Sequence, residues 1–136
     1  MMATLFDSSL WIDFLRPRSH RVLKQFIAEF FRTPNIGLAK PVIYEVLRYA
    51  SDKEIPQIQA QFRTLPLLAT PADLWTQAAK LGQACRRNGI NAGAIDLLIA
   101  QVAIHHNAEL LTFDSDFPGI ASVSALSVKL LKRPAT

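Results

Sequence analysis

The chain has a single cysteine, Cys85, and this scarcity excludes two kinds of small protein. With one thiol no disulfide can form within the chain, and a zinc cage built from several cysteines is ruled out. Disulfides are typical of oxidising compartments, so the lack of a pair favours a cytosolic protein. A hydrophobic core must therefore hold the chain together.

Long apolar runs are also missing. The most apolar stretch, 94–104, is interrupted by Asp96 and Gln101 and is too short to cross a bilayer. The strand-like segment 3–6 is broken by Asp7, so the N-terminus lacks the basic start and long apolar region of a signal peptide. We therefore expect no membrane segment and a cytoplasmic location.

Glycine is scarce, and no tract is rich in Pro and Gly or in Ser and Gln. Only five glycines, together with a hydrophobic content of 50%, argue against a disordered or fibrous protein. A chain of 136 residues is long enough to bury its own core. We expect a single domain over 1–136, with a loose tail at about 132–136.

Short strand-like segments alternate with amphipathic helices along the sequence. Strands are predicted at 3–6, 36–39, 66–68, 109–112 and 120–123, and helices at 10–15, 21–31, 41–47, 52–62, 71–87 and 94–106. The helix at 94–106 is apolar almost all round, so we expect it to pack on more than one side. This alternation is typical of an α/β fold with a parallel sheet.

Five of the eleven acidic residues occupy unusual places, at the ends of predicted strands or on apolar helices: Asp7, Glu45, Asp96, Asp114 and Asp116, called the five acids below. A carboxylate in such a place is costly to desolvate unless a cation or a hydrogen-bond donor meets it. Asp7 and Asp114 follow predicted strands, and ligands of open α/β sheets bind beyond the carboxyl ends of the strands. We therefore expect the five acids to meet at one hard-cation site.

The chemistry of the expected site follows from its donor atoms. Oxygen ligands without cysteine or clustered histidine select Mg²⁺ or Mn²⁺. Neighbouring carboxylates raise each other's pKa, and a divalent cation removes that conflict. Such a site is suited to phosphodiester hydrolysis, because the metal lowers the pKa of a coordinated water and stabilises charge on the leaving oxygen.

The charge of the chain is compatible with such a substrate. The net charge is +4 and the pI is about 9.6, which favours an anionic partner such as nucleic acid or an acidic protein segment. Basic residues gather at 16–24, 86–87 and 129–133. Each group can also be ordinary solvated surface, so charge alone does not decide between these interpretations.

Each of the five acids also has an ordinary structural explanation. Asp7 can cap the first helix. Asp96 can interact with the dipole of its helix. Glu45 can lie on a helix surface, and Asp114 and Asp116 can belong to a turn.

Three further polar residues have structural explanations. Asp13 is interpreted as a solvated or arginine-paired side chain. His105 and His106 end the predicted helix 94–106, where helix capping is favoured over catalysis.

Three segments together resemble a known family: LFDSSLWIDFL at 5–15, PVIYEVLR at 41–48 and AIDLLIAQVAIHHNAELLTFDSDF at 94–117. Their order and spacing are similar to those of PIN-domain ribonucleases, in particular VapC-type toxins of VapBC toxin–antitoxin systems. The resemblance spans nearly the whole chain. It implies a three-layer α/β/α fold with a central parallel sheet and a metal-dependent endoribonuclease that leaves 5′-phosphate and 3′-hydroxyl ends.

The resemblance also implies roles for individual residues. Asp7, Glu45, Asp96 and Asp114 match the catalytic acids, and Asp7, Asp96, Asp114 and Asp116 match the acids that bind one or two Mg²⁺ or Mn²⁺ ions. Ser8 matches a position that supports the first acid, and Thr112 a hydroxyl position before the fourth.

Partners are implied as well. RNA would be the substrate, and a small VapB-like antitoxin would insert its tail into the acidic groove. A homodimer is also expected, for which the phenylalanine-rich helix 21–31 is either interface or core.

Two alternatives to a nuclease have different requirements. A catalytically silent PIN-like module that binds RNA or protein would share the basic charge, but all four principal acids are present. A phosphotransfer domain would need an adjacent acidic pair, or Asp-x-Asp, after the first strand. The sequence Asp7-Ser8-Ser9 supplies neither.

Overall fold

A computed structural model describes residues 2–135 and contains a central parallel sheet. Its strands are β1 (Thr4–Phe6), β2 (Ile36–Gly37), β3 (Glu109–Thr112) and β4 (Ser127–Leu130). The strand order is β2-β1-β3-β4, and all three neighbouring pairs are parallel. β1 is buried along its whole length, as expected for a parallel strand covered on both faces.

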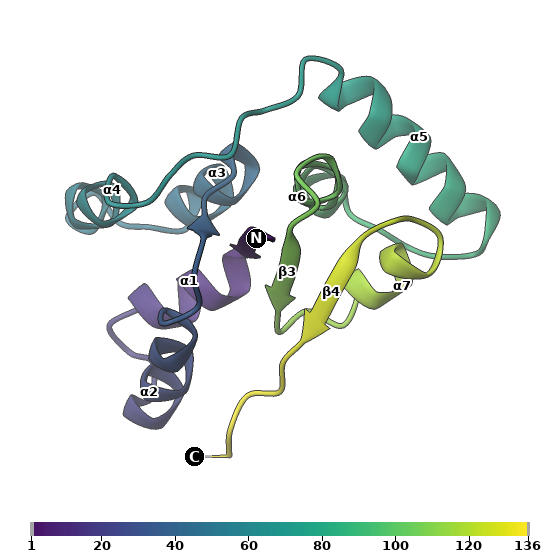
Figure 1. Ribbon diagram of the computed structural model, residues 1–136. Helices are drawn as coiled ribbons and strands as arrows, with labels where there is room; N and C mark the ends of the chain where they lie inside the picture. The colour runs from purple at the N-terminus through teal and green to yellow at the C-terminus, as the bar shows by residue number, and fades with distance from the viewer. Residues whose placement is uncertain (1, 136) are drawn as a thin grey trace.

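Helices cover this sheet on both sides. They are α1 (Ser8–Leu15), α2 (Arg21–Phe30), α3 (Lys40–Arg48), α4 (Ile55–Phe62), α5 (Leu74–Arg87), α6 (Ala94–His105) and α7 (Phe117–Ser122). In Figure 1, α1 to α4 gather on one side of the strands and α5 and α7 on the other. The expected three-layer α/β/α arrangement is confirmed. Within 2–135, none of these helices is long and apolar enough to cross a membrane.

Aromatic packing fixes the position of α1. The Trp11 ring lies 5.9 Å from Phe6, 5.3 Å from Phe31 and 5.0 Å from Phe62, measured between ring centroids. Trp11 is almost completely buried. Because these rings come from β1, α1, the end of α2 and α4, they hold the start of α1 firmly against the carboxyl end of β1.

The predicted last strand at 120–123 is wrong, because that segment ends helix α7. Pro118 lies in the first turn of α7, where its missing N–H and fixed φ are tolerated. The last strand is β4, which pairs with β3 and is only partly buried. A short apolar run does not distinguish strand from helix, and a partly exposed strand carries little hydrophobic signal.

Two smaller boundaries also differ. The predicted strand at 66–68 is reduced to one bridge between Leu38 and Leu67. Helix α4 begins at Ile55, so Asp52 does not cap it. Instead, the Glu54 carboxylate accepts a hydrogen bond from the Ser51 N–H at 2.8 Å, which orders the turn before the helix.

Candidate active site

The strand order places two of the five acids side by side. From β1 the chain crosses to β2 on one side and later returns to β3 on the other, so the order reverses between β1 and β3. A crevice forms beyond the carboxyl ends of the strands at such a switch point. Asp7 directly follows β1, and Asp114 follows β3 after Phe113. The expectation that both lie at this edge is confirmed.

Asp7 is buried, with 2% of its surface exposed, and both of its carboxylate oxygens accept hydrogen bonds. Oδ1 accepts from the backbone N–H of Ser9 at 3.0 Å and from the Ser9 hydroxyl. Oδ2 accepts from the Thr112 hydroxyl at 2.8 Å. The bond from the Ser9 N–H caps α1, so the capping explanation for Asp7 is correct. Capping does not account for the bond from Thr112, which connects Asp7 to β3.

The hydroxyls of Ser9 and Thr112 also reach the loop that carries Asp114. Thr112 Oγ1 accepts from the N–H of Asp114 at 2.8 Å, and Ser9 Oγ accepts from the N–H of Phe113 at 3.1 Å. Each hydroxyl donates one hydrogen bond to Asp7, and its oxygen accepts one from a backbone N–H of the loop. Ser9 is absent from the sequence-based site, although Asp-x-Ser at a helix start is a signal that could have found it.

Ser8 supports the second acid, and the expectation that it supports Asp7 is wrong. Its hydroxyl donates to Oε1 of Glu45, a half-buried residue of α3. Ser8 is the first residue of α1, whereas Ser9 is the second and folds back onto the cap. Consecutive helical residues point in different directions, so the two serines hold different acids.

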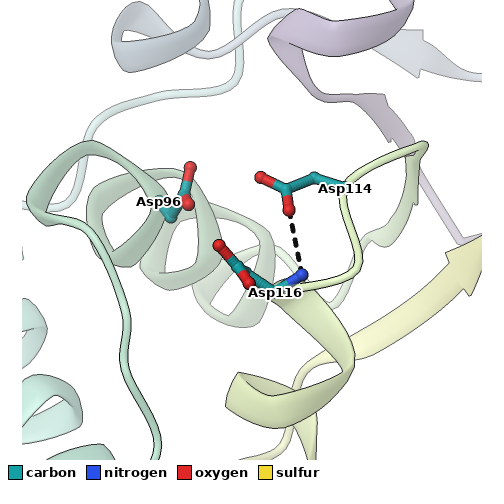
Figure 2. A group of neighbouring side chains, drawn as sticks. All are labelled: Asp96, Asp114 and Asp116. Carbon is teal, nitrogen blue, oxygen red and sulfur yellow. Dashed lines mark hydrogen bonds between the residues drawn. The ribbon is translucent and has the colours of Figure 1, made fainter.

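Asp96, Asp114 and Asp116 form a tight cluster. Each offers one carboxylate oxygen, and these oxygens all lie within 4.8 Å of one another. Figure 2 shows the three side chains around a common space, Asp96 from the first turn of α6 and the others from the loop after β3. The N–H of Asp116 donates to Oδ1 of Asp114 at 2.9 Å, so the turn explanation for these two residues also holds.

The pKa values of Asp7 and Asp96 are both raised. Burial raises the pKa of Asp7 to about 6, and the hydrogen bonds from Ser9 and Thr112 oppose that rise. Burial also raises the pKa of Asp96 to about 7, with further contributions from the charges of Asp114, Glu45, Asp7 and Asp116, in that order. The negative charges of the other four acids therefore all act on Asp96.

Other polar residues singled out in the sequence lie in different surroundings. Asp13 accepts a hydrogen bond from Nε of Arg133 at 2.7 Å, so its assignment as an arginine-paired side chain is confirmed. His106 is the C-terminal cap residue of α6, but its Nε2 contacts the carbonyl oxygen of Ala69 at 2.6 Å.

The donor set suits a hard divalent cation. Its ligating atoms are carboxylate oxygens that repel one another when ionised, and a cation between them relieves that repulsion. Several oxygens without sulfur match Mg²⁺ or Mn²⁺ better than zinc or copper. The residues present therefore fit the kind of ion that the sequence implies.

Comparison with known proteins identifies the family. The model of the PIN domain matches residues 4–123. The chain belongs to the PIN-domain family. Among curated relatives of this PIN domain, ribonuclease VapC11 of Mycobacterium tuberculosis is 28% identical over 128 residues, covering 90% of the chain and 94% of VapC11. Ribonuclease VapC21 of the same species is 31% identical over 74 residues, covering 53% of the chain and 54% of VapC21.

Solved structures share the fold of this PIN domain. VapBC2 from Rickettsia felis bound to a DNA fragment from its promoter superposes with a TM-score of 0.73 at 18% identity, covering 96% of the chain and 100% of the matched chain. A toxin–antitoxin complex from Klebsiella pneumoniae gives a TM-score of 0.63 at 25% identity, covering 90% and 96%. The resemblance of the sequence to VapC-type PIN proteins is thereby confirmed.

The raised pKa of Asp96 predicts an unusual pH dependence of stability in the metal-free protein. Between its ordinary pKa of 3.8 and about 7, the folded chain binds more protons at Asp96 than the unfolded chain does. Stability should therefore fall as pH rises through this window. Asp96→Asn should be more stable than the wild type above this range, by about 1–2 kcal/mol after allowance for solvent screening.

Urea unfolding in EDTA at a series of pH values checks this prediction. Asp52→Asn is the matched control, because Asp52 is exposed and is not among the charges that raise the pKa of Asp96. A wild-type stability that rises across the window, or an Asp96→Asn curve parallel to the wild type, would contradict it.

Proposed function

We propose that this PIN domain is a Mg²⁺- or Mn²⁺-dependent endoribonuclease that acts as the toxin of a VapBC-type module. The observation that carries the proposal is the cluster of three carboxylates, Asp96 from α6 with Asp114 and Asp116 from the loop after β3, which share one small space. The ribonuclease names of the curated relatives support the choice of RNA as substrate. An RNA substrate is also compatible with action in the cytoplasm.

The geometry supports ligand roles for Asp96, Asp114 and Asp116, whose oxygens share one space. Asp7 would join them as the resemblance implies, and Glu45 adds a further acid from α3. When bound, the ion supplies a Lewis acid that activates water and offsets the negative charge of the phosphodiester. Asp7 is oriented by two hydroxyls and a backbone N–H, so its carboxylate is fixed before any ligand arrives.

Water is the nucleophile that this site favours. The hydroxyls of Ser8, Ser9 and Thr112 all donate to carboxylates, so none of them is free to attack phosphorus. Cys85 is buried, and burial raises the pKa of its thiol, which disfavours the reactive thiolate. Hydrolysis without a covalent intermediate is the mechanism compatible with these contacts.

Loss of a central acid should abolish cleavage. Asp7→Asn and Asp96→Asn each remove negative charge from the donor set, so we expect cleavage of total RNA to fall by about a hundredfold or more. The assay compares Mg²⁺ or Mn²⁺ with EDTA and examines the fragments for 5′-phosphate ends. Asp52→Asn serves as the control that keeps full activity.

Two results would count against this mechanism. Undiminished cleavage by either folded variant would remove the acids from the reaction. Absence of cleavage by the folded, metal-loaded wild type would favour the catalytically silent RNA- or protein-binding module.

A homodimer is supported by an exposed apolar face, called the Tyr44–Trp75 face. Trp75 on α5 is 74% exposed and Tyr44 on α3 is 54% exposed. They border a pocket of about 330 Å³ whose apolar lining is Pro41, Tyr44, Leu74, Trp75, Ile95 and Leu98. Helix α2, by contrast, packs Phe26 and Phe30 against the core. Exposed apolar patches of this kind mark interfaces, so we propose that a second copy covers this face.

Trp75→Glu should separate the two copies. Loss of an interfacial tryptophan typically costs at least about 2 kcal/mol, so the dimer dissociation constant should rise about thirtyfold or more. Analytical ultracentrifugation measures the change, and Tyr49→Glu is the control on another exposed aromatic residue. A monomeric wild type, or an unchanged dimer in Trp75→Glu, would refute the assignment of this face.

The tail of a VapB-like antitoxin is expected at the five acids, and a second surface is available for another of its segments. A groove of about 920 Å³ lies between the α1–α2 connection and helices α3 and α4, called the α1–α4 groove. Its floor includes Ile12, Leu23 and Ile58. Its charged lining is Arg16, Arg18 and Lys53, with Asp13 and Glu54. An apolar floor whose basic neighbours outnumber its acidic ones fits an amphipathic, acidic segment, so we propose that such a segment of the antitoxin binds here.

Leu23→Glu should weaken inhibition by a co-expressed antitoxin. A carboxylate on the apolar floor of the α1–α4 groove opposes an acidic amphipathic segment, and we expect at least about tenfold more antitoxin to be needed. RNA cleavage in the presence of increasing antitoxin measures the effect. Val22→Glu changes the adjacent exposed residue outside the groove and should leave inhibition unchanged. Equal inhibition of both variants would argue against this binding site.

A further inference from the structure

Arg133 lies beside the loop that carries Asp114, although it comes from the segment after β4. The N–H of Leu131 donates to the carbonyl oxygen of Thr112 at 2.7 Å and brings this segment to the end of β3. The guanidinium carbon of Arg133 then lies 4.5 Å from the ring centroid of Phe113, the residue before Asp114. Figure 1 shows the C-terminal segment leaving past the ends of β3 and β4.

The guanidinium of Arg133 is held on two sides. Its Nε donates to Oδ2 of Asp13 at 2.7 Å, and one face lies over the ring of Phe113. Within the described residues, the hydrogen bonds of this side chain are confined to Nε. The side chain of Arg133 is 51% exposed, whereas that of Asp13 is 12% exposed. The terminal amino groups of Arg133 therefore keep donors for a partner from solvent.

This arrangement has the chemistry of a phosphate-binding group. A planar guanidinium offers paired donors that match two phosphate oxygens. Because Asp13 and Phe113 already restrict the side chain, little conformational entropy remains to be lost on binding. Lys132 is also exposed and adds positive charge beside it. The five acids repel phosphate, so a fixed cation beside the loop that carries Asp114 is well placed to hold the backbone there.

We propose that Arg133 binds a backbone phosphate of single-stranded RNA beside the loop that carries Asp114. The proposal rests on the proposed ribonuclease function and names the residue that holds its substrate. Arg133 is a binding residue in this scheme. Its pairing with Asp13 serves to orient the guanidinium, and the contribution of an exposed ion pair to stability is small.

Direct binding separates this proposal from catalysis. A short fluorescent single-stranded RNA is titrated with the full chain in EDTA, so that metal-dependent cleavage does not occur. Arg133→Gln should bind the RNA about tenfold more weakly, the scale of one charge-assisted hydrogen bond. The slope of log affinity against log salt should become shallower by about 0.7, as expected when a protein neutralises one phosphate fewer on a single strand.

Three comparison variants distinguish binding from a structural role. Asp13→Asn removes the negative charge of the ion pair, while its amide oxygen can still accept from Nε and keep the guanidinium oriented. It should bind RNA at least as tightly as the wild type, because a nearby negative charge is removed. Arg32→Gln removes an equal charge from another exposed ion pair, Arg32 with Glu29, ahead of β2, and should leave affinity unchanged. Arg133→Lys keeps the charge without the paired donors and should fall between the wild type and Arg133→Gln.

Thermal melting of each variant confirms that it is folded. Wild-type affinity in Arg133→Gln would overturn the proposal, as would an equal loss of affinity in Asp13→Asn. If the wild type cleaves RNA while Arg133→Gln binds normally, this proposal alone fails. If the wild type binds RNA through Arg133 but cleaves none, the ribonuclease function fails and the role of Arg133 in binding phosphate stands.

Discussion

The hydrogen bonds to the Asp7 carboxylate join the parts of the molecule on which the site depends. Asp7 follows β1 and caps α1, and Thr112, whose hydroxyl donates to Asp7, is the last residue of β3. Burial of this carboxylate is unfavourable, as its pKa of about 6 indicates, and the donors from Ser9 and Thr112 offset part of that cost. Because the same hydroxyls accept the N–H groups of Phe113 and Asp114, the first and fourth acids are fixed relative to each other. The fixed position of Asp7 therefore depends on β1 and β3 ending at the same level of the sheet.

The start of α1 organises a second acid through the same short segment. Ser8 donates to Glu45 on α3 and Ser9 donates to Asp7, so two adjacent residues orient two different acids. The aromatic cluster around Trp11 lies directly behind this segment and prevents α1 from rotating away. Core packing and site geometry are therefore coupled, because a shift of α1 would move both serines at once. Asp96 lies on α6, apart from the start of α1, and the charges of the other four acids act on it.

Much of this architecture is predictable from the sequence, and the failures have physical causes. The strand at 109–112 and the helix from Ala94 are correctly placed because both are strongly apolar and clearly bounded. The convergence of acids is foreseen because Asp7 and Asp114 follow buried strands. By contrast, the segment 120–123 is too short for its apolar residues to show a helical or a strand period. β4 is too exposed to show the alternation of apolar and polar residues that marks a strand. The contacts of Ser8 and Ser9 depend on the direction of each side chain in the first helical turn, and spacing alone does not determine that direction.

The strand order has a consequence for how the protein is made. β1 pairs with β2 across a short stretch of sequence, but its other edge is completed only by β3, which begins at Glu109. Until that strand has been synthesised, a growing chain exposes one side of β1 and lacks Thr112, Asp114 and Asp116. The central pairing is therefore non-local, a kind of contact that forms late and slows folding. The acidic site is therefore assembled only when nearly the whole chain has been made.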